Sequence, residues 1–125
     1  MAAKTEKGDD MTILEIFEKV NLAIPIEQRD FFNYFDDSVR EIEALYASDR
    51  KNLVFKPDTE YTAPATLGDE NAVLPLYSGA IVDNILFMAG QGEAYKNGFL
   101  RKARSAYLNY WNKNAKGKRM GGSNV

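Results

Sequence analysis

One seam of apolar residues limits what this chain of 125 residues can fold into. Its members stand three, four, three and four residues apart: Phe32, Phe35, Val39, Ile42 and Tyr46. This is the spacing of one face of an α-helix, whereas every second residue would be apolar on one face of a β-strand. The seam therefore predicts an amphipathic helix from near Pro25 to about Ala47.

Two further helices are marked by their ends. Thr12 and Glu15 form a T-x-x-E capping box, in which each side chain bonds a backbone N–H of the first turn. This helix is short, because Pro25 follows it closely. Another helix has Pro75 in its first turn, is apolar on nearly every side and ends before Gly90. Such a helix is buried on most sides, either at the centre of a bundle or in a subunit contact.

A fourth helix is predicted from about Glu93 to Trp111, because aromatic and small residues recur there at helical spacing. They are Tyr95, Phe99, Ala103, Ala106, Tyr107 and Tyr110. The aromatic residues near its end could also stack on nucleic-acid bases. Their register with Phe99 and Ala103 favours packing in the core instead.

The segment 49–73, between the second and third helices, has no helical period and is interrupted by prolines and a glycine. Leu53, Val54 and Phe55 form a short β-type run that is too small to stand alone as a strand. A connection of this length inside a compact domain is usually functional or disordered. We predict a projecting loop or a short β-hairpin, whose run either pairs with a strand of another chain or forms an edge strand of a surface loop.

These elements predict one all-α, four-helix bundle-like domain over residues 11–112. A flexible N-terminal arm at 1–10 and a flexible basic tail at 113–125 flank it, because both segments lack apolar periodicity.

Charge is sorted by position along the chain. Residues 1–92 hold 8 Lys+Arg against 17 Asp+Glu, a net charge of −9. Residues 93–125 hold 8 Lys+Arg against Glu93 alone, a net charge of +7. A chain with opposite poles can join copies of itself head to tail, or hold a polyanion at one end.

Several classes of chemistry are excluded by composition. The chain has no cysteine and no histidine, so it lacks thiol nucleophiles, zinc–thiolate sites and the commonest general base. It has no phosphate-binding loop, hydrolase or calcium-loop signature. No stretch approaches the ~20 apolar residues that a membrane-spanning helix needs. We therefore predict no enzyme activity, no cofactor and no membrane partner.

Two charged groups are the candidate contact residues. Asp36, Asp37, Glu41 and Glu43 lie on the second helix, where no histidine accompanies them, so a solvated or partner-facing stripe is favoured over a metal site. Lys113, Lys116, Lys118 and Arg119 lie within seven residues of the tail and suit phosphate contacts or an acidic protein surface.

The order of elements resembles that of the head–tail connector (adaptor, or head-completion) proteins of tailed bacteriophages. The resemblance covers roughly residues 11–112. It rests on the Thr12–Ile16 helix start, the acidic helix containing Val39–Glu43, the Leu74–Ile81 start of an apolar helix, and the basic, aromatic Lys102–Tyr107 stretch. Those proteins are small α-helical subunits, commonly assembled as a twelve-fold ring beneath the portal.

The resemblance implies a virion protein of the neck, assembled in the host cytoplasm. Its expected partners are its own copies in a homo-dodecameric ring, the portal protein, the next neck or tail-completion protein, and packaged DNA without sequence preference. The 49–73 loop, including Leu53, Val54 and Phe55, and the basic tail would reach the portal and neighbouring copies. Arg101, Lys102 and Arg104 could face DNA in the channel.

Two other functions remain open. One is a small helical nucleic-acid-binding protein that uses the basic C-terminal helix and tail. The other is an adaptor or regulatory module that binds an acidic partner through its tail.

Overall fold

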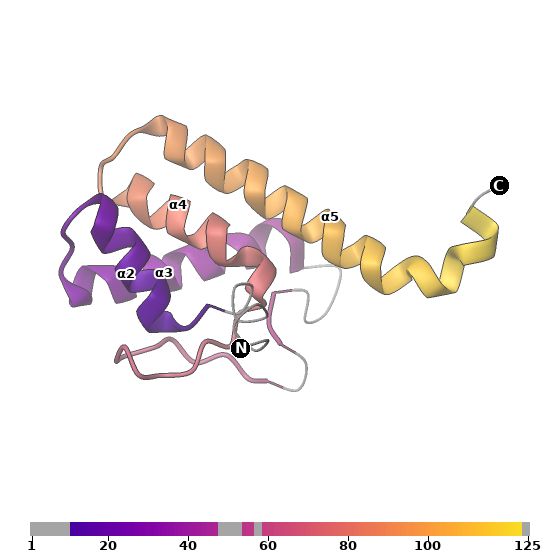
Figure 1. Cartoon of the computed structure of the whole chain (residues 1–125), viewed down its shortest axis with the longest axis horizontal. Coiled ribbons are helices and arrows are strands. Elements are labelled where there is room, and N and C mark those ends of the chain that lie inside the picture. The colour runs from indigo at the N-terminus through magenta and orange to yellow at the C-terminus, as the bar shows by residue number, and fades with distance from the viewer. Residues whose placement is uncertain (1–10, 48–53, 57–58, 124–125) are drawn as a thin grey trace, which may run out of the picture.

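The computed structural model describes residues 11–47, 54–56 and 59–123, the last stretch, 111–123, by its backbone alone. Four α-helices account for most of this part: α2 (Ile13–Ala23), α3 (Gln28–Ile42), α4 (Ser78–Met88) and α5 (Glu93–Ser123). A π-helical turn, η1 (Glu43–Ala47), extends α3, and a 3-10 turn, η2 (Pro75–Tyr77), leads into α4. The predicted all-α, bundle-like class is confirmed (Figure 1).

The first helix begins as its capping box predicts. The Thr12 side chain accepts a hydrogen bond from the Glu15 N–H at 3.1 Å, and Glu15 accepts one from the Thr12 N–H at 2.9 Å. The helix continues to Ala23, and the Asn21 side chain then accepts from the N–H of Ile26 at 3.1 Å. That bond orders the turn after α2, so α3 begins at Gln28 rather than near Pro25.

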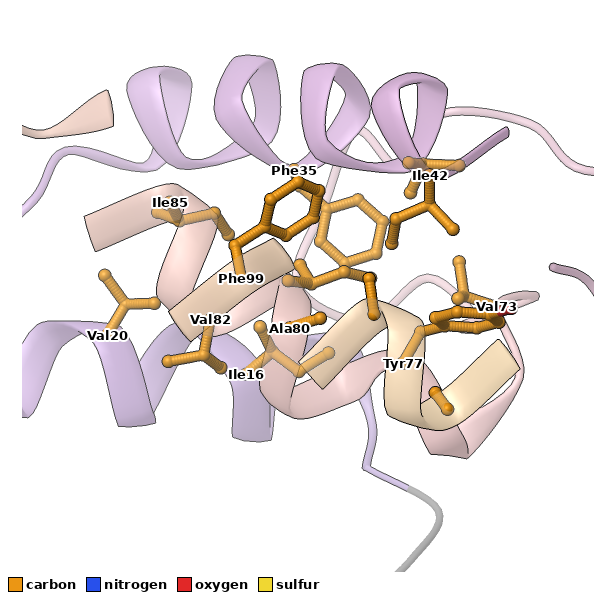
Figure 2. Close-up of a cluster of buried hydrophobic side chains, with 14 of the residues drawn as sticks. Ile16, Val20, Phe35, Ile42, Val73, Tyr77, Ala80, Val82, Ile85 and Phe99 are labelled. Carbon is orange, nitrogen blue, oxygen red and sulfur yellow. The ribbon is translucent and has the colours of Figure 1, made fainter. Parts of the chain in front are cut away.

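Helix α4 lies at the centre of the bundle and packs against α2, α3 and α5. Its side chains Ala80, Ile81 and Ile85 are fully buried. This settles the two alternatives left open for an apolar helix, because α4 meets three helices of its own chain. Figure 2 shows its side chains meeting those of the neighbouring elements.

The seam on α3 faces this core, shifted slightly from its predicted register. Phe35, Val39 and Ile42 are fully buried, as is Phe31, whereas Phe32 lies at the edge of the core. The Phe31 ring meets the rings of Phe17 and Phe32 edge to face, with centroids 5.2 and 5.4 Å apart. The Phe17–Phe31 pair joins α2 to the start of α3.

The turn from α4 to α5 uses two glycines. Gly90 and Gly92 have φ of +88° and +120°, which L side chains rarely adopt. The Gly90 N–H donates to the Phe87 carbonyl at 2.9 Å, and the Gln91 N–H donates to the Leu86 carbonyl at 3.0 Å. Gly90 therefore ends α4 as the sequence predicts.

Helix α5 is longer than its sequence pattern predicts. It continues to Ser123, well past Trp111, and its C-terminal part extends beyond the other helices (Figure 1). No proline interrupts residues 112–123, and lysine, arginine, alanine and methionine there favour helix, whereas Gly117, Gly121 and Gly122 oppose it. The mobility proposed for 113–125 stays a prediction.

Candidate assembly surfaces

The acidic helix and the basic helix meet inside one chain. Lys96 of α5 donates to a carboxylate oxygen of Glu41 on α3, and its ammonium lies 3.3 Å from the Asn84 side-chain oxygen. The Asn84 amide, fully buried on α4, donates to Ser38 at 3.0 Å and to Glu41 at 3.3 Å. Glu41 is therefore engaged within its own chain, which differs from the solvated or partner-facing stripe predicted for it.

Asp36 ties α3 to the long connecting segment. Its carboxylate accepts from the Arg40 guanidinium at 2.9 Å and from the Tyr61 hydroxyl at 2.7 Å. Burial and this hydrogen bond to Asp36 raise the pKa of Tyr61 above its ordinary range. Asp37 is exposed and Glu43 is half-buried. Of the four predicted acidic residues, Asp37 is thus the one on the open outer side of α3.

On α5 the predicted DNA-facing cations divide into two kinds. The Lys102 ammonium lies 2.9 Å from an Asp83 carboxylate oxygen, which rests against α5 where Gly98 has no side chain. Arg101 and Arg104 are exposed. Lys102 therefore joins α4 to α5 while 47% of its side chain stays exposed, beside the two exposed arginines.

The exposed face of α5 also carries two leucines that the sequence analysis did not identify as surface residues. Leu100 and Leu108 are 40% and 39% exposed, and with Arg104 they follow one another at intervals of four residues. Side chains spaced in this way share one helix face. The sequence does indicate their position, because each leucine stands one or two residues after a member of the buried stripe of Phe99, Ala103 and Ala106 and so lies on a different part of the helix surface.

The β-type run of the connecting segment pairs within its own chain. The Leu74 N–H donates to the Val54 carbonyl at 2.8 Å and the Lys56 N–H to the Ala72 carbonyl at 2.9 Å, around an antiparallel bridge between Phe55 and Val73. Val54 is fully buried, and Phe55 stacks on Tyr61 with ring centroids 5.1 Å apart. Val54 is therefore a core residue and not the partner contact predicted, while Leu53 lies outside the described residues.

The predicted basic contacts of the tail lie on the continuation of α5. Lys113, Lys116, Lys118 and Arg119 belong to its helical course, and their side chains are outside the described part. Just before them, Tyr107 stacks on Tyr46 with centroids 4.6 Å apart, and Tyr110 packs against the core. These two tyrosines pack within the protein, as their register predicts.

A groove between α2 and the connecting segment was missed by sequence reasoning. Its volume is about 580 Å³, and residues 11, 12 and 14 face 56, 59 and 67–72 across it. The Asn71 amide fixes the two walls together by donating to the Met11 carbonyl at 2.8 Å. Because this contact joins residues 60 positions apart, no local sequence pattern could have predicted it.

The described residues contain neither a metal-ligand cluster nor a membrane-spanning helix. In that part of the chain no three aspartates or glutamates converge as a metal ion would require. Nor does any helix there combine the length and the apolar character needed to cross a bilayer.

Comparison with protein-family models, with curated proteins and with solved structures finds no match to this chain.

Proposed function

We propose that this chain is a structural subunit of an oligomeric ring that joins the portal of a tailed-phage capsid to the tail. In this role copies of the chain contact each other, the portal and the next neck protein within the virion. The proposal rests on the resemblance described above and on surfaces that a helical body of this size does not need for its own folding.

The observation that carries the proposal is the extension of α5 beyond the body. Helix α5 spans 31 residues, and no other described helix lies beside its C-terminal part (Figure 1). Helical stability in proteins comes mainly from packing of an amphipathic face, so an unpacked helical arm gains little on its own. The arm carries four cations and no acid between residues 113 and 119, which suits an acidic surface on another molecule.

The outer face of α5 supports the same role. Leu100 and Leu108 expose apolar surface beside Arg101 and Arg104, a combination common at the edges of protein interfaces. A ring requires that one face of a subunit meet a different face of the next. The exposed acidic residues lie mainly on α2, α3 and the connecting segment, so the two faces of such a contact differ in charge.

The test combines the purified chain with the portal protein encoded in the same genome. Native mass spectrometry and negative-stain imaging should show the chain as a monomer alone and as a closed ring on the portal vertex when both are present. A chain that remains monomeric and unbound in the presence of assembled portal would contradict the proposal.

A nucleic-acid-binding function is favoured by one observation, the exposure of Arg101 and Arg104 on the same helix as the basic arm. If this function holds, the isolated chain binds duplex DNA, and the logarithm of the affinity falls with the logarithm of salt by about 0.9 per phosphate contacted. Weak DNA binding by the isolated chain, together with ring formation on the portal, would exclude this alternative.

A further inference from the structure

The groove between α2 and the connecting segment, here the α2–loop groove, is lined by apolar side chains and by exposed acidic ones, here its acidic rim. Met11, Leu14 and Leu67 line it together with Asp69 and Glu70. A smaller hollow of about 330 Å³ adjoins it, shares Asp69 and Glu70 with it, and adds Glu60. Lys56 is the one cation among these lining residues, against three carboxylates.

Hydrogen bonds favour the charged form of Asp69 in the acidic rim. Asp69 accepts hydrogen bonds from the Ala65 and Thr66 N–H groups at 2.7 and 2.9 Å, and another from the Thr66 hydroxyl at 2.9 Å. These bonds lower the pKa of Asp69 below its ordinary value. They also fix the turn that holds Glu70 at the rim, where both Glu60 and Glu70 are exposed.

The chain itself contains a segment whose chemistry complements this groove. Residues 113–120 carry Lys113, Lys116, Lys118 and Arg119, followed by the apolar Met120, with no acidic residue between them. Residues 1–10, which lead directly to the groove at Met11, hold three acidic and two basic residues. Charge therefore favours the C-terminal segment over the N-terminal one as the occupant.

The helical course of α5 makes the occupied groove that of another copy. In Figure 1 the helix leaves the body at the end of the molecule opposite α2, so it carries its C-terminal segment away from its own groove. A contact between different surfaces of two copies repeats from one copy to the next, and closes into a ring when the rotation allows it.

We propose that the α2–loop groove of one copy binds the basic C-terminal segment of α5 of the next copy. Glu60, Asp69 and Glu70 attract the cations, while Met11, Leu14 and Leu67 receive the apolar side chain of Met120. This inference rests on the proposed function, because it locates the contact between neighbouring copies in the ring.

Cysteine cross-linking tests the contact directly, since the chain has no cysteine of its own. Two single variants, Leu67→Cys and Met120→Cys, are mixed in the presence of portal and treated with a short bismaleimide. The proposal requires a cross-linked dimer in this mixture. The control replaces Leu67→Cys by Leu22→Cys, a position that is 87% exposed on α2 outside the groove, and should give no cross-linked dimer. A Thr5→Cys partner that cross-links to Leu67→Cys, with no product from Met120→Cys, would place the N-terminal segment in the groove and overturn the proposal.

Charge exchange tests the chemistry of the contact. Glu60→Lys with Glu70→Lys, or Lys116→Glu with Lys118→Glu, should weaken self-association on the portal by about a hundredfold, because like charges then face each other. Combining all four substitutions in one chain should restore it. The control is Glu18→Lys, an exposed charge reversal on α2 outside the groove. It should change association by less than about threefold, because solvent and salt screen a charge away from the contact.

The outcomes separate this inference from the proposed function. The groove contact is overturned if rings form equally well with the groove reversals. It is also overturned if the chain with all four substitutions does not recover association. Neither outcome contradicts the proposed function. A wild-type chain that forms no ring contradicts the proposed function, and the cross-linking result then decides the groove contact by itself.

Discussion

Two regions of the molecule are held in place by different means. One is the contact between α4 and α5, called the seam from here on, and the other is the connecting segment that precedes α4. In the seam Ile81, Ile85, Phe99 and Ala103 are all fully buried between regular helices. The described parts of the connecting segment, residues 54–56 and 59–73, have no helix or extended strand. Val54 and Val73 are buried in the core, and the rest of the segment is placed by single polar contacts. The principal ones are the Tyr61–Asp36 bond, the Asn71–Met11 bond, the Asp69 turn and one β-bridge.

This difference predicts how each region responds to substitution. Loss of a buried side chain in the seam affects every helix that packs there, so the free energy of global unfolding falls. Loss of one polar contact in the connecting segment allows a local opening with a smaller free-energy change. The α2–loop groove, one wall of which belongs to this segment, can therefore be altered by mutation while the helical body stays folded.

The largest effect is expected from Phe99→Ala in the seam. Phe99 is fully buried on α5, and truncation of a buried phenylalanine costs about 3–5 kcal/mol of unfolding free energy. Urea denaturation followed by circular dichroism measures this loss. The matched control is Leu100→Ala, one residue along the same helix and 40% exposed, which should cost less than about 1 kcal/mol. Equal losses for both variants would show that α5 does not pack as described.

A smaller effect separates two glycines at the same seam. A Cβ at Gly98 would lie 2.5 Å from an Asp83 carboxylate oxygen, so Gly98→Ala should displace the Asp83–Lys102 pair and cost about 1–3 kcal/mol. A Cβ at Gly79 would lie 3.7 Å from the Lys102 side chain, an ordinary contact. Gly79→Ala should therefore stabilise the protein by about 0.4–1 kcal/mol through the unfolded state. Thermal unfolding of the two variants checks both signs, and a destabilised Gly79→Ala would contradict the packing described for α4 and α5.

The sequence predicted the helices far better than the connecting segment. Helical spacing of Phe35, Val39 and Ile42, the Thr12 capping box and Gly90 each act within a few residues, and the structure confirms all three signals. The boundary of α5 was placed too early, because polar, glycine-containing sequence does not by itself end a helix.

The contact surfaces were harder to predict, because they depend on pairs of residues far apart in the chain. Glu41 and Lys96 are 55 positions apart, and no local pattern shows that these opposite charges meet inside one subunit. Val54 has the pattern of an exposed β-type residue, but the bridge between its neighbour Phe55 and Val73 brings Val54 into the core. Charge sorting along the chain therefore does not show which charges remain outside.

The smallest effects compare two tyrosine hydroxyl groups, one from each region. The Tyr61 hydroxyl donates to Asp36, so Tyr61→Phe should cost about 1 kcal/mol at neutral pH. The hydroxyl of Tyr77, fully buried at the start of the seam, has no hydrogen-bond partner among the described residues. Tyr77→Phe should therefore leave the unfolding free energy unchanged or raise it slightly, since a buried unpaired hydroxyl opposes folding.

Alkaline pH should reduce the contributions of Tyr61 and Tyr77 to the unfolding free energy in the same way. Burial is the largest cause that raises the pKa of both Tyr61 and Tyr77, so the folded state holds their neutral forms while the unfolded chain ionises. Their stabilising contribution is complete below the unfolded pKa of about 10 and is lost as pH rises toward the raised folded values. Each phenylalanine variant should therefore lose less stability than the wild type between about pH 9 and 11, measured by urea denaturation. If Tyr61→Phe flattened this dependence and Tyr77→Phe did not, the Tyr77 side chain would have to be in contact with water, and the start of the seam would be more open than its burial indicates.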